Sequence, residues 1–157
     1  MFIYRTPVRS NWLDFNGHMN VLPYFEVFST ASSLVERDLG LGLSYLDSGH
    51  SLFSGDIHIT YVREVPAGAT LTVRTRIIDV DAKRFVLHLE MLDDSDGALA
   101  ATAEMVELNV GVKSRKVEPF RPEVLERIRK AQREQGGGDP PRNVGRSATI
   151  KAGAPQR

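Results

Sequence analysis

Residues 14–39 read DFNGHMNVLPYFEVFSTASSLVERDL, a polar loop that leads directly into an amphipathic segment. From Val21 to Leu39, apolar residues recur at three- and four-residue steps, which is the spacing of one face of a helix. Asn20 is a suitable N-cap, Pro23 is tolerated in a first turn, and Gly40 is placed to end the helix. The stretch therefore predicts one long helix over residues 21–39.

After this helix the apolar period changes to two, which is the period of strands with one buried face. The alternation extends over residues 53–61, 71–77, 85–91 and 99–112, and residues 2–8 also resemble a strand. Short turns rich in Pro, Gly and Asp separate these runs, which favours antiparallel neighbours. In the last run the alternation changes phase near Glu104, which predicts a β-bulge there.

These elements predict one antiparallel sheet with a single long central helix on its apolar face, an α+β arrangement. Residues 122–134 indicate a polar C-terminal helix. The chain then continues as Gly-Gly-Gly-Asp-Pro-Pro and shows no further hydrophobic periodicity. We predict one domain over residues 1–134 and a disordered tail over residues 135–157.

The composition limits the classes of function. With 20 basic and 20 acidic residues, the chain has no formal net charge, so no overall field attracts nucleic acid or an anionic membrane. The chain has no cysteine, which excludes disulfides, thiolate metal sites and a cysteine nucleophile. Its histidines lack metal-ligand spacing, so we predict neither a metal nor a cofactor. The N-terminus lacks the apolar core of a signal peptide, and we predict a cytoplasmic protein.

The loop over residues 14–20 holds the side chains with the clearest chemical potential, and it suits the hydrolysis of an activated acyl group. Asp14 can act as a nucleophile, giving a mixed anhydride, or as a base that activates water, and the sequence leaves both routes open. Asn16 can orient the water or the carboxylate. His18 can share the role of base or bind the oxygen of the acyl group.

Backbone N–H groups at the start of the helix are the expected oxyanion donors, aided by the helix dipole. They belong to Gly17, Val21 and Leu22. The alternative is purely structural, because Asp, Asn and Gly are also the commonest residues in caps and tight turns. Glu26, on the helix, is a second candidate carboxylate. No Gly-x-Ser-x-Gly elbow is present, which argues against a serine hydrolase.

This order of elements and this loop resemble the hotdog-fold thioesterases of the 4-hydroxybenzoyl-CoA thioesterase type. In that family an Asp-x-x-Gly turn precedes the central helix and a tyrosine follows on its first turn. Asp14, Gly17 and Tyr24 match this pattern. Asp14, Asn16 and His18 are also similar to the Asp-x-Asn-x-His element of plant acyl-carrier-protein thioesterases. The resemblance covers residues 1–130.

The resemblance implies an acyl-CoA thioesterase that forms a homodimer or homotetramer with active sites at the subunit interface. It further implies that substrate is bound by Tyr24, His58, Tyr61 and Arg63. More narrowly, the chain is similar to the thioesterases of carnitine breakdown, which hydrolyse betainyl-CoA. A quaternary ammonium group of that kind favours aromatic partners. The candidates are Trp12, Phe53 and Tyr61.

Two other functions fit the same fold. A hotdog dehydratase or hydratase is disfavoured because its His-Phe-Pro-x-x-Pro signature is missing. A non-catalytic acyl-CoA-binding domain stays open, because a fold does not fix a function. Several basic side chains can meet the phosphates of CoA, although they also suit solvated strand faces. These are Arg63, Arg74, Arg76, Lys83 and Arg84.

Overall fold

The computed structural model describes residues 1–135 and 144–145, and it contains the predicted helices and strands. In chain order the elements are β1 (Phe2–Pro7), η1 (Ser10–Trp12), α1 (Val21–Asp38), η2 (Leu43–Ser48), β2 (His50–Tyr61), β3 (Thr70–Val80), β4 (Arg84–Asp93), β5 (Leu99–Gly111) and α2 (Pro122–Arg133). The 3₁₀ helices η1 and η2 were not predicted. The disordered tail predicted for residues 135–157 lies almost entirely outside the described residues.

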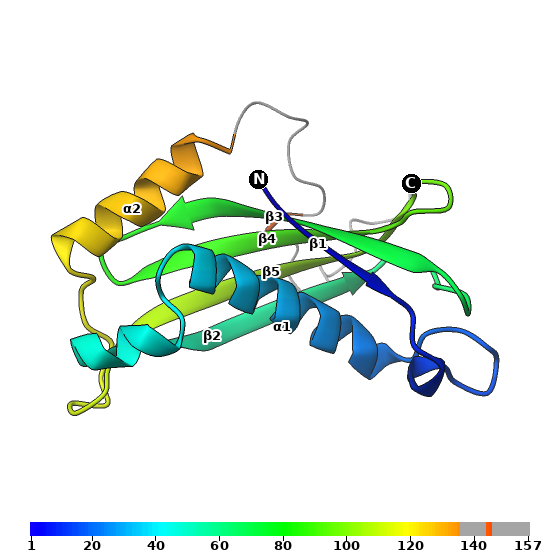
Figure 1. The fold of residues 1–157 in the computed structure, drawn as a ribbon, viewed down its shortest axis with the longest axis horizontal. Coiled ribbons are helices and arrows are strands. Elements are labelled where there is room, and N and C mark those ends of the chain that lie inside the picture. Colours follow the sequence, from blue (N-terminus) through cyan, green and yellow to red (C-terminus); the bar gives the residue numbers. More distant parts are fainter. Residues whose placement is uncertain (136–143, 146–157) are drawn as a thin grey trace, which may run out of the picture.

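The five strands form one antiparallel sheet in the order β1-β3-β4-β5-β2. Helix α1 lies across one face of this sheet, and α2 lies at one end of it (Figure 1). The predicted α+β hotdog architecture is therefore confirmed. Strands β1 and β2 form the two edges, and β2 is the longer edge, with 12 residues against six.

Helix α1 begins and ends as its sequence predicts. The Oδ1 atom of Asn20 accepts a hydrogen bond of 2.6 Å from the Val21 amide, and Gly40 adopts a left-handed φ of +70° just after the helix. The face towards the sheet is apolar, with Phe28 and Val35 among its buried residues. Burying each such side chain stabilises the fold by about 1.5–3 kcal/mol, so packing rather than propensity fixes the position of α1.

The β-bulge predicted near Glu104 is wrong. Strand β5 pairs with β4 without a break from Ala101 to Leu108, and its irregularity falls instead at Ala100. A second irregularity lies at Gly55 in β2. The apolar alternation changes phase because polar residues occupy core positions on the face of β5 that packs against α1.

Those polar residues are Glu107 and Asn109, which are 1% and 0% exposed. The side-chain amide of Asn109 donates to two backbone carbonyls at 3.0 and 3.1 Å, and its oxygen accepts from the Tyr45 hydroxyl at 2.9 Å. Both the oxygen and the nitrogen of the Asn109 side chain thus have hydrogen-bond partners, as buried amides usually do. Among the described residues, the hydrogen bonds to the Glu107 carboxyl come from two serine hydroxyls, those of Ser54 on β2 and Ser32 on α1.

Candidate active site

A pocket of about 410 Å³ opens where the loop before α1 meets the end of β2. Most of the residues singled out from the sequence are in its wall. The lining consists of Asp14, Asn16, His18, Met19, Val21, Tyr24, Tyr61, Val62, Arg63 and Glu64. The predicted catalytic residues and three of the four predicted substrate-binding residues are therefore brought together by the fold.

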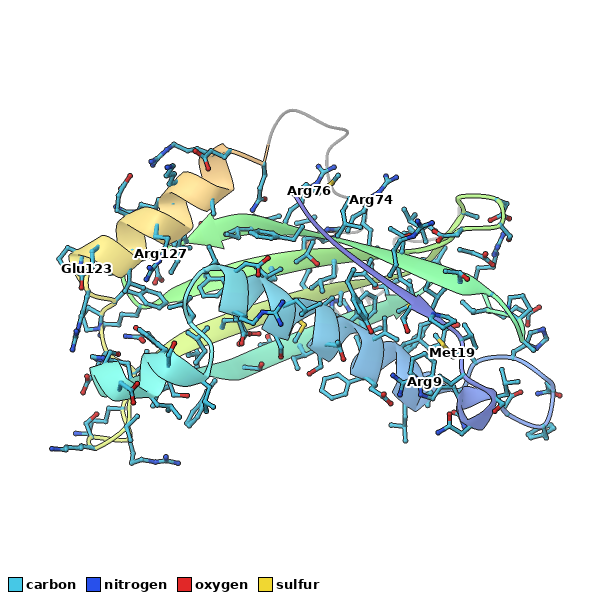
Figure 2. The ribbon with its side chains drawn as sticks, in the orientation of Figure 1. Arg9, Met19, Arg74, Arg76, Glu123 and Arg127 are labelled. Atoms are coloured by element: carbon cyan, nitrogen blue, oxygen red, sulfur yellow. The ribbon has the colours of Figure 1, made fainter. Side chains whose placement is uncertain are left out.

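The loop over residues 13–19 is held by its own backbone. The Asp14 amide donates to the His18 carbonyl at 2.8 Å, and the Gly17 amide donates to the Asp14 carbonyl at 3.1 Å. Gly17 has a φ of +80°, a conformation that favours glycine because it has no Cβ. Met19, labelled at the start of α1 in Figure 2, is buried and its amide donates to the Val65 carbonyl at 2.8 Å. The loop is thus fixed at both ends.

The backbone of this loop holds one oxygen of the Asp14 carboxylate. Oδ1 accepts hydrogen bonds from the backbone amides of Asn16 at 2.8 Å and His18 at 3.2 Å. No backbone amide of the described residues donates to Oδ2, and the Asn16 side chain lies beside the carboxylate. Burial opposes ionisation of this carboxyl, but the two backbone hydrogen bonds, the Asn16 side chain and the charge of His18 outweigh it and lower its pKa. Asp14 is therefore ionised at neutral pH, and its Oδ2 atom has no backbone partner among the described residues.

The backbone amides around the loop are mostly engaged already. Those of residues 17–21 all donate within the chain, to Asp14 O, Asp14 Oδ1, Val65 O, Trp12 O and Asn20 Oδ1 in turn. Gly17 and Val21 were expected as oxyanion donors, and the structure does not leave their N–H groups free for that role. Pro23 has no N–H group, so Leu22 is the remaining first-turn donor, as the first amides of a helix have no helical partner.

Glu64 is a pocket residue that the sequence did not reveal. Its Oε1 atom lies 3.6 Å from His18 Nε2, and its side chain is 71% exposed. The contact depends on a β-bridge between His18 and Pro66, which joins the loop to the segment after β2. A pairing between residues so distant in the sequence cannot be predicted from a local pattern. In the sequence, Glu64 follows Arg63 and looks like an ordinary charged surface residue.

Two tyrosines form an aromatic wall of the pocket. The rings of Tyr24 and Tyr61 meet edge to face with centroids 5.1 Å apart, a favourable geometry for aromatic pairs. The Tyr24 hydroxyl donates to the Arg63 carbonyl at 3.4 Å, and the Tyr61 hydroxyl donates to the Val21 carbonyl at 3.5 Å. These contacts orient both rings, and Tyr61 remains 48% exposed.

The charge of Arg63 is balanced inside the chain. Its guanidinium lies 2.7 Å from Asp96 and 3.4 Å from Asp93, and hydrogen bonding to Asp96 is the main reason that its pKa is raised. Of the other cations expected to meet CoA phosphates, Arg74 and Arg76 lie far from Met19 and hence from the pocket (Figure 2).

Other predicted residues lie outside the pocket. His58 is paired with Glu104 of β5, and alternation along β2 places it on the face opposite Tyr61. Trp12 is 4% exposed and lies under the Arg9 guanidinium, 4.7 Å from the ring centroid. A second guanidinium covers Phe53, and Glu26 contacts Arg9 at 3.3 Å. Tyr61 is thus the only one of the three aromatic candidates that lines this pocket.

Within residues 1–135 and 144–145, no group of three or more acidic or histidine side chains is arranged to hold a metal ion. None of the helices in the same part of the chain is both long and apolar enough to cross a membrane.

Comparison with known proteins identifies the family. Residues 8–128 match the model of the thioesterase-like superfamily, so the chain belongs to that family. A betainyl-CoA thioesterase from Pseudomonas aeruginosa is 35% identical over 144 residues, which cover 91% of each chain. A two-part L-carnitine dehydrogenase/betainyl-CoA thioesterase from Agrobacterium fabrum is also 35% identical, over 78% of this chain. The match spans 25% of that longer relative.

Solved structures agree with this assignment. A Staphylococcus aureus protein in complex with CoA superposes with a TM-score of 0.88 at 28% identity, over 96% of this chain and 95% of that one. A DHNA-CoA thioesterase from the same species has a TM-score of 0.74 at 19% identity, over 84% and 91% of the two chains. The second likeness concerns the fold alone.

Proposed function

We propose that this acyl-CoA thioesterase hydrolyses betainyl-CoA and that Asp14 carries the reaction. The observation that supports the role of Asp14 is that its two carboxylate oxygens differ in their hydrogen bonds to the backbone. Oδ1 is fixed by two backbone amides, whereas no backbone amide of the described residues binds Oδ2, and Asp14 lines the pocket. A positioned carboxylate of this kind has much of its ordering entropy removed before the substrate binds.

We propose the nucleophilic route, which requires an ionised carboxylate, and the lowered pKa of Asp14 keeps it ionised at neutral pH. The alternative is that Asp14 acts as a base on water. Oδ2 attacks the thioester carbonyl carbon, the carbon–sulfur bond breaks, and CoA leaves as a thiolate that is then protonated. The acyl group remains on Asp14 as a mixed anhydride.

Water completes the cycle by attacking the acyl carbonyl carbon of the anhydride. The His18 imidazole accepts the proton of this water, and the Asp14 carboxylate leaves as the free acid is formed. In both steps the negative charge develops on the carbonyl oxygen, where the Leu22 N–H group and the helix dipole stabilise it.

The betainyl group is proposed from the relatives and from the pocket together. Both curated relatives described above are betainyl-CoA thioesterases, wholly or in one part. The pocket adds aromatic surface from Tyr24 and Tyr61, which suits a quaternary ammonium group. The cytoplasmic location stays a prediction from the sequence.

We further propose a homodimer that forms through β2. This strand is an open edge of the sheet, and open edges are usually paired or covered. Large apolar side chains are also exposed on β2 and the nearby part of α1, namely Val21, Leu22, Phe25, Phe53, Tyr61 and Val62. Antiparallel pairing about a twofold axis would set the start of one β2 beside the end of the other, and so beside the Asp14 pocket.

Release of free thiol from a panel of acyl-CoAs tests the function. We expect the highest kcat/KM for betainyl-CoA among betainyl, short neutral and aromatic acyl groups. Higher turnover of another acyl group would contradict the proposed substrate. Tight binding of every acyl-CoA without thiol release would favour the non-catalytic binding domain instead.

A further inference from the structure

We infer that Glu64 selects acyl groups that carry a positive charge close to the thioester carbonyl. This inference rests on the proposed function, because it concerns the acyl group that is presented to Asp14. It assigns to the carboxylate beside His18 a role in specificity rather than in bond breaking.

The balance of charge in the pocket is the first argument. Asp14 and Glu64 both contribute carboxylates to the wall. Among the described residues of the wall, the one guanidinium belongs to Arg63, and Asp93 and Asp96 already bind it. His18 is the other basic group there, and it is neutral when it acts as the proposed base. The pocket is then negative where the acyl group must lie, and a cationic acyl group is attracted while an anionic one is repelled.

The second argument is the position of Glu64 beside the aromatic wall. Tyr24, Tyr61 and Glu64 line the same pocket. The Tyr24 hydroxyl donates to the carbonyl of Arg63, the residue directly before Glu64, so the Glu64 backbone lies beside the end of that ring. Aromatic rings together with a carboxylate form the setting in which quaternary ammonium groups are recognised.

The chemistry of the substrate supplies the third argument. In a betainyl thioester one methylene separates the ammonium nitrogen from the carbonyl carbon, so the cation must lie in the same pocket as Asp14. The other pair of acids, Glu36 and Glu107, lies under the far end of α1. Along the helix, Asn20 and Glu36 are about 24 Å apart at 1.5 Å per residue, so that pair cannot serve the same acyl group within one chain.

The test compares two acyl-CoAs of the same shape. Betainyl-CoA and 3,3-dimethylbutyryl-CoA differ only in having a quaternary nitrogen or a quaternary carbon. Binding is measured by calorimetry in an Asp14→Asn background, so that the result does not depend on turnover. We expect this variant to bind betainyl-CoA about tenfold more tightly than the neutral isostere, since an exposed carboxylate is partly screened.

Adding Glu64→Gln should reduce this preference severalfold, to the part that the Tyr24 and Tyr61 rings supply, and leave the affinity for the isostere unchanged. Glu123→Gln is the matched control, because Glu123 lies on α2, far from Met19 and the pocket (Figure 2). A preference of undiminished size in Glu64→Gln, or an equal loss of affinity for both ligands, would overturn the inference.

The catalytic rates separate this role from an effect exerted through His18. In the otherwise unchanged enzyme, Glu64→Gln should lower kcat/KM for betainyl-CoA and spare the isostere. A Glu64 that served only to orient His18 would lower kcat for both substrates, which would overturn the inference. Failure of the proposed function has a different signature, namely no turnover of betainyl-CoA by the unaltered enzyme, whatever the binding preference.

Discussion

The hydroxyl oxygen of Ser54, an exposed residue of the edge strand β2, lies 3.1 Å from each carboxylate oxygen of the buried Glu107, its direct partner on β5. From α1, Ser32 Oγ lies 3.5 Å from Glu107 and 2.9 Å from Glu36. Burial, followed by the nearby charge of Glu36, raises the pKa of Glu107 to about 7, and the serine hydroxyls offset this only in part. Burial also raises the pKa of Glu36. Two carboxyls thus share a site in which a proton is favoured.

The first prediction concerns stability and pH. Because the pKa of Glu107 is higher in the folded state, its contribution to stability is complete below the unfolded value of about 4.5 and is lost as pH rises through about 7. The free energy of unfolding should therefore fall between pH 5 and pH 8.5. The loss is on the order of 3 kcal/mol at most. Glu107→Gln should flatten this slope in urea titrations at fixed protein concentration, whereas Glu123→Gln should keep it.

Asp14→Asn should nearly abolish turnover and leave folding and acyl-CoA binding intact. The substitution keeps the shape of the side chain and removes the charged oxygen that we propose attacks the thioester. The expected decrease in kcat is at least about 10²–10⁴-fold. Thiol release and circular dichroism would be measured on the same preparation. A decrease of less than about tenfold would assign the chemistry to another group.

The nucleophilic route predicts a covalent intermediate on Asp14. Rapid mixing of enzyme with betainyl-CoA followed by borohydride should reduce the mixed anhydride and convert Asp14 to homoserine, which peptide mass spectrometry detects. Enzyme without substrate and Asp14→Asn with substrate are the controls. If Asp14 stays unmodified and thiol release shows no burst, the carboxylate acts as a base on water.

Leu22→Pro should lower kcat by about 10²–10³-fold, because it deletes the remaining first-turn N–H group. Val21→Pro is the matched control, since it removes an amide that already donates to Asn20 Oδ1. Proline is well accepted in the first helical turn. Asn20 has the extended backbone that a proline at position 21 requires, whereas a proline at position 22 would follow the helical Val21, as Pro23 already follows the helical Leu22. The melting temperature of both variants shows whether they fold. Equal activity in the two variants would place the oxyanion donor elsewhere.

The dimer proposal predicts that the enzyme elutes and scatters light as at least a dimer in dilute solution. Phe53→Lys, on the open edge strand, should shift the protein towards the monomer and reduce activity, because it places a charge in the interface. Glu123→Gln again serves as the control. A fully active monomer would contradict the proposal that two chains complete the site.

Much of the fold follows from periodicity. The three- and four-residue spacing of α1, its Asn20 cap and the following Gly40 specify the helix locally, and the strand alternation specifies a sheet with one buried face. Alternation could not reveal that Glu107 and Asn109 occupy core positions. A polar residue at a buried position is stable only with partners from other elements, and those partners are distant in the sequence.

The candidate site was likewise predictable only where it depends on local sequence. The polar loop and the tyrosine of the first turn are local features, and the fold brings them to one pocket. The contribution of Glu64 depends on the bridge between His18 and Pro66, and the use of the Gly17 and Val21 amides depends on hydrogen bonds that only a folded loop forms. Both depend on geometry that a linear pattern does not contain.

The loop over residues 13–19 is held mainly by hydrogen bonds of its own backbone. The position of Asp14 is therefore independent of the side chains that are proposed to recognise the acyl group. The loop holds the Asp14 carboxylate by its own backbone amides, whereas Tyr24, Tyr61 and Glu64 reach the pocket from α1, from β2 and from the segment after β2. Substitutions of these three residues are expected to change the accepted acyl group without moving the Asp14 carboxylate. Related enzymes that share this loop can therefore differ in the acyl group they accept and still use the same chemistry.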